Sequence, residues 1–74
     1  MTVNEAFSKN LVKFMKEQGF IDRTLAESSG LMRETIMNIR LGNHGLRLVT
    51  AYLISTALNK TLDEMIEGAD EWLK

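Results

Sequence analysis

The chain has no cysteine, no proline and a single histidine, His44. Without cysteine, neither a disulfide framework nor a cysteine zinc site can form, and one histidine alone does not make a metal site. No run of residues approaches the roughly 18 consecutive apolar residues that a membrane span requires, and the first residues show no signal-peptide pattern. These absences predict a soluble, cytoplasmic protein that has no cofactor and no contact with a membrane.

The sequence also gives little evidence of an enzyme's active site. The 74 residues make one small domain, residues 1–74, with an expected core over 3–67 and a short acidic tail over 68–74. No paired carboxylates appear in a domain large enough for a pocket, and Asp63 and Glu64 are explained by helix capping. We therefore expect a protein that is not an enzyme.

The charge is nearly balanced overall but unevenly distributed. The net charge is −1, yet residues 1–60 hold eight Lys or Arg against five Asp or Glu, whereas residues 61–74 hold one Lys against five acids. Nucleic-acid binders usually show a basic balance. The mildly basic part of the chain, residues 1–60, can still bind the phosphates of DNA, because binding depends on the local charge of the surface and not on the net charge.

The absence of proline and the abundance of Leu, Ile and Met predict an all-α domain of five helices. Thr2 with Glu5 and Thr61 with Glu64 fit capping boxes, while Gly19 and Gly42 mark helix ends. The expected helices run from the Thr2 cap to about Gln18, from about Asp22 to Ser28, from about Met32 to Leu41, from Leu46 or Arg47 to Leu58, and from the Thr61 cap to about Glu67.

The fourth of these helices is apolar nearly all round, which predicts burial on more than one side. Either this helix lies at the centre of the domain or one of its faces meets a partner. The tail carries Trp72, which either closes the core or docks on a second subunit. A homodimer therefore stays open as an alternative.

The second and third helices, joined by a turn at Ser28-Ser29-Gly30, form a helix-turn-helix pattern. The whole arrangement resembles the Cro/CI-type (lambda-repressor-like, XRE-like) helix-turn-helix family of phage repressors and their bacterial relatives. The resemblance covers roughly residues 8–67 and is carried by Leu11, Phe14, Gly19, Leu25-Ala26, Ser29-Gly30-Leu31, Thr35-Ile36, Ile39, Gly42, Leu58 and Leu62-Asp63-Glu64-Met65.

The resemblance implies a DNA-reading surface on the third helix. Arg33 would donate two hydrogen bonds to a guanine, Asn38 would pair with an adenine edge, and Thr35 would touch a thymine methyl group. Glu34 and Met37 occupy the other base-reading positions. Phosphate contacts, which position a protein without specifying sequence, would come from Arg23, Asn43, His44 and Arg47.

Several residues depart from the family pattern. Asp22 stands where the family commonly has Gln near a phosphate, and a carboxylate there would repel the DNA backbone. Met32 occupies the N-cap position of the third helix, where the family favours Ser or Thr. The family's ion pair between the first and third helices cannot form, because Met15 and Arg40 occupy those positions.

Apolar residues gather on the same side of the helix-turn-helix: Ile21, Met32, Met37 and Leu41. An exposed apolar cluster usually marks a protein contact, and methionine suits an adaptable binding surface. Whether Met37 and Leu41 instead turn back into the core stays open at this point.

Two functions fit these observations for a transcriptional regulator of a phage-type lysis/lysogeny switch in a bacterial host cell. We favour a small antirepressor, or modulator of repression, that binds a sister phage repressor or assists it as a co-repressor. Its partner-binding residues would be Ile21, Asp22, Met32, Glu34, Met37 and Leu41. The alternative is a dimer that binds double-stranded operator DNA directly, as Cro does.

Overall fold

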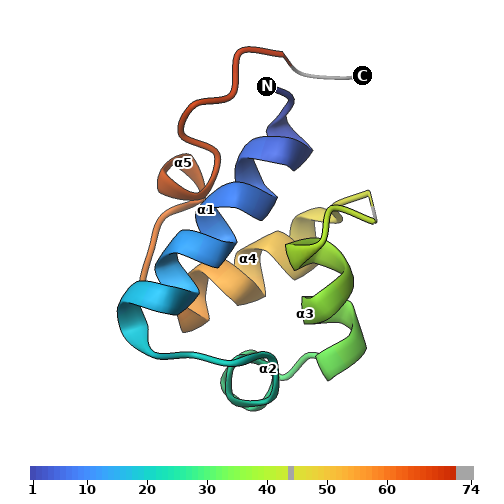
Figure 1. Ribbon diagram of the computed structural model, residues 1–74, viewed down its shortest axis with the longest axis vertical. Coiled ribbons are helices and arrows are strands. Elements are labelled where there is room, and N and C mark those ends of the chain that lie inside the picture. Colours follow the sequence, from blue (N-terminus) through green and yellow to red (C-terminus); the bar gives the residue numbers. More distant parts are fainter. Residues whose placement is uncertain (44, 72–74) are drawn as a thin grey trace.

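The computed structural model describes residues 1–43 and 45–71. Within these residues the chain is helical, and no helix has the length and apolarity needed to cross a membrane. The order of elements agrees with the predicted all-α class (Figure 1). The five helices are α1 (Val3–Gln18), α2 (Asp22–Ser29), α3 (Arg33–Arg40), α4 (Leu48–Ala57) and α5 (Leu62–Met65).

Both ends of α1 form as the sequence predicts. The Thr2 hydroxyl accepts a hydrogen bond from the Glu5 backbone N–H at 3.1 Å, and the Glu5 carboxylate accepts one from the Thr2 N–H at 2.7 Å. These two bonds satisfy donors that the first helical turn leaves unpaired. Gly19 ends the helix with φ of 75°, a left-handed conformation that favours glycine.

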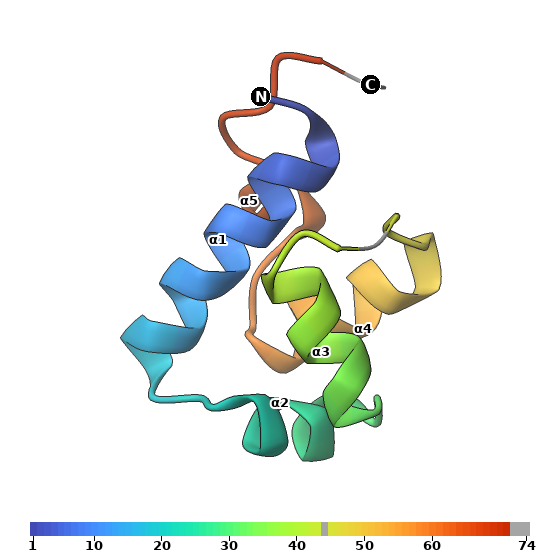
Figure 2. The same cartoon turned by 45° about the vertical axis from the view of Figure 1, so that its right-hand side comes forward.

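The turn between α2 and α3 depends on Gly30. This residue has φ of 76°, and its N–H donates to the Ala26 carbonyl at 2.9 Å. Met32 precedes α3 in an extended conformation but offers no side-chain cap, as the sequence predicts. Figures 1 and 2 show α2 at the end of the molecule opposite the chain termini.

All five helices contribute to one hydrophobic core. Its fully buried side chains include Leu25 from α2, Ile36 from α3 and Ile54 from α4, and these meet the inner face of α1. The other core members are Phe7, Leu11, Phe14, Met15, Ala26, Ile39, Ala51, Leu58 and Met65. This packing holds α2 and α3 in a fixed relation, so that the side chains on their outer faces form a defined surface.

Of the two alternatives for α4, a position at the centre of the domain is not what the structure shows, because within one chain the helix is buried along one side only. That its other face meets a partner stays a prediction. Only Ala51, Ile54 and Ser55 are buried along this helix. The side chains of Leu48 and Val49 on its other face are exposed. Because the helix is apolar all round, its sequence gives no periodicity from which the inner face could be chosen.

The fifth helix ends at Met65, earlier than the predicted end near Glu67. Its Thr61 cap forms as expected, with the hydroxyl accepting from the Glu64 N–H at 3.1 Å. The Asn10 carboxamide of α1 donates to the Met65 carbonyl at 2.9 Å and to the Glu67 carbonyl at 3.0 Å. These bonds from another helix satisfy carbonyls that would otherwise need a continuing chain or water.

After α5 the chain returns to the N-terminus, and Figure 1 shows the two segments side by side. The Val3 N–H donates to the Glu71 carbonyl at 3.1 Å, and the Asp70 N–H donates to the Met1 carbonyl at 2.9 Å. The Met1 ammonium forms an ion pair with Asp70, whose hydrogen bond raises the pKa of the ammonium. The predicted role of Trp72 lies outside the described residues.

The turn geometry predicts the effect of replacing Gly30. No atom lies within 4 Å of a Cβ built on Gly30, so Gly30→Ala meets no clash and the cost comes from the left-handed backbone, about 1 kcal/mol. Gly45 has equal space without a left-handed φ, so Gly45→Ala should leave the free energy of unfolding nearly unchanged. Chemical denaturation followed by circular dichroism measures both; equal values for the two variants would contradict this account.

Candidate functional site

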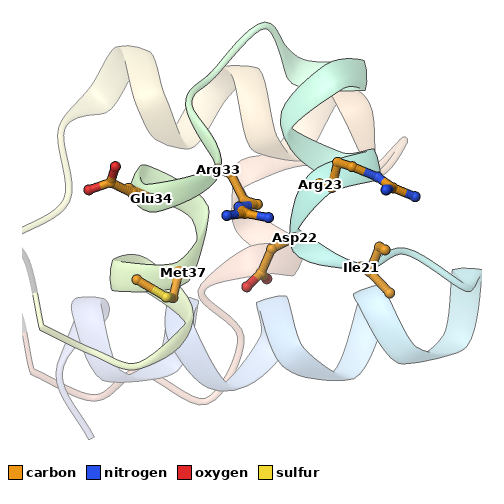
Figure 3. Close-up of a pocket in the computed structure, with 6 residues that line it drawn as sticks. All are labelled: Ile21, Asp22, Arg23, Arg33, Glu34 and Met37. Carbon is orange, nitrogen blue, oxygen red and sulfur yellow. The ribbon is translucent and has the colours of Figure 1, made fainter.

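The outer faces of α2 and α3 enclose a surface hollow of about 360 Å³, here called the central hollow. Figure 3 shows the start of α2 on one side and α3 on the other, with Arg33 and Asp22 in the middle and with Arg23 and Glu34 pointing outward. The lining residues are Ile21, Asp22, Arg23, Arg33, Glu34 and Met37. The structure therefore brings together four of the six predicted partner-binding residues and four of the eight predicted DNA-binding residues.

The central hollow is lined by two acidic side chains, Asp22 and Glu34, and two basic ones, Arg23 and Arg33. Among residues 1–43 and 45–71, no ion pair involves Arg23, Arg33 or Glu34. Asp22, in contrast, is paired with Arg40, which does not line the hollow. The unpaired charges of the central hollow are therefore two cations and one anion, a small excess of the kind that phosphate binding uses.

Asp22 is already occupied within the chain. Its two carboxylate oxygens accept hydrogen bonds from Arg40, at 3.0 Å from Nε and 2.9 Å from the terminal nitrogen. This two-point geometry is the stronger form of an Arg–carboxylate pair. The bonds to Asp22 raise the pKa of the Arg40 guanidinium. Of the two acids among the predicted partner-binding residues, Asp22 is therefore engaged, and Glu34 has no ion pair among the described residues.

The Asp22–Arg40 pair is an ion pair that the sequence did not predict. It joins the beginning of α2 to the end of α3, and both side chains are only partly exposed, at 21% and 33%. From the sequence alone we expected the family's pair to be missing, because Met15 and Arg40 occupy its positions, but Asp22 was not assigned as a partner of Arg40. The two residues are 18 positions apart, so that only the packing of α2 on α3 reveals the pair.

Two further hollows extend this surface across α1. One shares Ile21 and Asp22 with the central hollow, and the other contains Leu41. Both are lined by Val12 and Arg40. The three hollows thus form one continuous surface, with the Asp22–Arg40 pair at its centre.

Four exposed apolar side chains border the pair, and together they are called the apolar rim: Val12, Ile21, Met37 and Leu41. Ile21 and Leu41 are each 56% exposed and Met37 is 37% exposed, so none of the three turns back into the core. Val12 was absent from the predicted partner-binding residues. The sequence did offer a signal for Val12, because it is an apolar residue on the side of α1 that faces away from the core.

The remaining predicted residues lie elsewhere. Met32 is 68% exposed but does not line the three hollows. Thr35 and Arg47 line a separate hollow between α3 and the beginning of α4. Asn43 is exposed and Asn38 is half-buried, and neither lines a described hollow. The proposed phosphate contact of His44 lies outside the described residues.

Comparison with protein-family models, with curated proteins and with solved structures finds no match.

A double-mutant cycle tests the Asp22–Arg40 pair. We expect Asp22→Asn and Arg40→Met to show a coupling free energy of about 0.5–1 kcal/mol, because the pair is partly exposed but held at two points. The coupling should shrink at high salt. The matched control combines Asp22→Asn with Arg47→Met, an arginine that lines the separate hollow near the beginning of α4, and should show no coupling. Equal coupling in the two cycles would mean that the pair has no specific effect.

Proposed function

We propose that this chain is a transcriptional regulator of the Cro/CI-type helix-turn-helix class that acts by binding a repressor protein. In this proposal α2 and α3 form the helix-turn-helix, and the apolar rim with the central hollow is the contact surface. The partner is a sister repressor of the same phage-type switch. Binding masks the DNA-reading face of that repressor or changes its affinity for the operator.

One observation carries the proposal: the exposed side chains of the apolar rim surround an ion pair in which Asp22 and Arg40 neutralise each other. Apolar side chains gathered on one surface mark protein contacts, and methionine adapts its shape to a partner. A protein interface typically has an apolar centre from which charges are depleted. Here Arg40, a cation that could otherwise meet a phosphate, is neutralised by Asp22 at 2.9 Å.

One of the unpaired charges, Glu34, supports a basic partner, whereas the unpaired Arg33 supports the second candidate below. Glu34 is exposed beside Met37 in the central hollow and has no ion pair among the described residues. The DNA-binding face of a repressor is basic, so its Lys or Arg side chains would complement Glu34, while Met37 supplies apolar contact area. Complementary charge of this kind chiefly sets specificity and the rate of encounter.

Direct binding of operator DNA is the second candidate, and it is favoured by Arg33. This side chain is exposed on α3 and has no ion pair among residues 1–43 and 45–71. In the helix-turn-helix arrangement, α3 would lie in the major groove, where an arginine donates two hydrogen bonds to a guanine.

Met37→Asp tests the partner-binding function. A carboxylate placed among apolar contacts would lose its hydration on binding, so the variant should lose its complex with the repressor while its helical circular dichroism stays near that of the unmodified protein. Ser28→Asp is the matched control, since Ser28 is exposed on α2, lies outside the three hollows and receives the same charge. Calorimetric titration measures both; full affinity in Met37→Asp would remove this surface from the interaction.

Arg33→Ala tests the alternative. If α3 reads DNA, the change should cost about 1–3 kcal/mol of binding free energy and relax specificity at one base pair. Binding to a set of operator variants, each altered at one position, measures this effect. An unchanged preference at every position would show that Arg33 reads no base.

A further inference from the structure

Lysines form a stripe along the outer face of α1. Lys9, Lys13 and Lys16, here called the lysine stripe, recur at spacings of four and three residues, which places them on one side of the helix. All three are exposed, whereas Leu11 and Phe14 face the core on the other side. The stripe is about 10 Å long, because each residue of an α-helix adds about 1.5 Å.

The charges of the lysine stripe are not neutralised within the described part of the chain. Among residues 1–43 and 45–71, no carboxylate forms an ion pair with these lysines. The Lys13 ammonium lies 5.6 Å from the centroid of the Phe14 ring, a cation–π contact that leaves its charge in place. Lys60, in contrast, is paired with Glu64 at 3.9 Å. The stripe therefore presents its positive charges to whatever lies over α1.

The lysine stripe borders the apolar rim. Lys16 lines the hollow that contains Ile21, and Lys9 lines the hollow that contains Leu41. Val12, on α1, lines both. Figure 3 shows the pale blue ribbon of α1 along the edge of the central hollow beside Ile21. A protein that covers the apolar rim therefore reaches the lysines of α1 as well.

The apolar side chains beside the stripe favour a protein over DNA as its occupant. Val12 lies between Lys9 and Lys16 along α1 and is 44% exposed. Phosphates draw their affinity from cations and gain no contact from an apolar side chain. A protein segment can cover Val12 with apolar residues of its own and place Asp or Glu side chains opposite the lysines, in the usual arrangement of an apolar centre with a polar edge.

We infer that the lysine stripe binds acidic side chains of the repressor that contacts the apolar rim. The inference rests on the proposed function and adds a requirement for the partner: basic residues face Glu34 on α3, and acidic residues face α1. The lysines lie at the exposed edge of the contact surface, where water still reaches them. Charge pairs in such a place chiefly set the rate of encounter and its dependence on salt.

Stopped-flow mixing of the chain with the repressor, without DNA, tests the inference. A triple variant with Lys9→Glu, Lys13→Glu and Lys16→Glu should associate about tenfold more slowly at low salt, because attraction becomes repulsion. The difference should shrink as salt rises. Lys16→Glu alone should slow association more than Arg47→Glu, a matched reversal of an exposed charge outside the three hollows. All variants should keep the helical circular dichroism of the unmodified chain.

The outcomes of this experiment separate the two proposals. If the unmodified chain forms no complex with the repressor, the proposed function is overturned and this inference with it. If the complex forms and the triple variant associates at the same rate, only the inference is overturned. A triple variant that binds free repressor normally but not repressor on operator DNA would show that the stripe meets phosphates, which also overturns it.

Carbodiimide cross-linking of the complex gives a readout that needs no substitution. The reagent joins a lysine amine to a carboxylate in contact with it, with loss of water. Mass spectrometry should therefore find lysines of the stripe joined to Asp or Glu of the repressor. The Lys60–Glu64 pair is the internal control, because its link should form with or without the repressor. A complex in which Lys60 is linked but no lysine of the stripe is linked to the repressor would overturn the inference.

Discussion

The ion pair between Asp22 and Arg40 is the interaction on which the character of the outer surface depends. It joins the beginning of α2 to the end of α3 through two hydrogen bonds of 3.0 and 2.9 Å. The core beneath it, built on Leu25 and Ile36, fixes the positions of the two helices. It does not determine which side chains lie on their outer faces. The pair removes one cation and one anion from the surface. The four exposed apolar side chains of the apolar rim border it, together with the charged residues of the three hollows.

A core of this size leaves apolar residues outside, and their positions are informative. The apolar rim lies over α1, α2 and α3, whereas the exposed side chains of Leu48, Val49 and Tyr52 lie apart from it on α4.

Local chemistry made much of the fold predictable from the sequence. Thr2, Gly19 and Thr61 form helix caps with residues only a few positions away in the sequence, so these caps could be recognised directly. Features that depend on distant contacts could not. Arg40 meets Asp22 across 18 positions, and Asn10 of α1 donates to the Met65 carbonyl at the end of α5 and to the Glu67 carbonyl beyond it. The inner face of α4 was likewise hidden, since nearly every residue of that helix is apolar. The exposure of Ile21, Met37 and Leu41 needed the packed structure to establish it.

Fluorescence anisotropy of labelled operator DNA, taken from the region beside the gene of this chain, tests the central claim most directly. The titration is run with this chain alone, with the sister repressor alone and with both, at several salt concentrations. The account predicts no tight binding by this chain alone and a clear change in the repressor's binding when the chain is added. Tight binding by the chain alone, falling steeply with salt as phosphate contacts require, would contradict it and establish a direct operator binder.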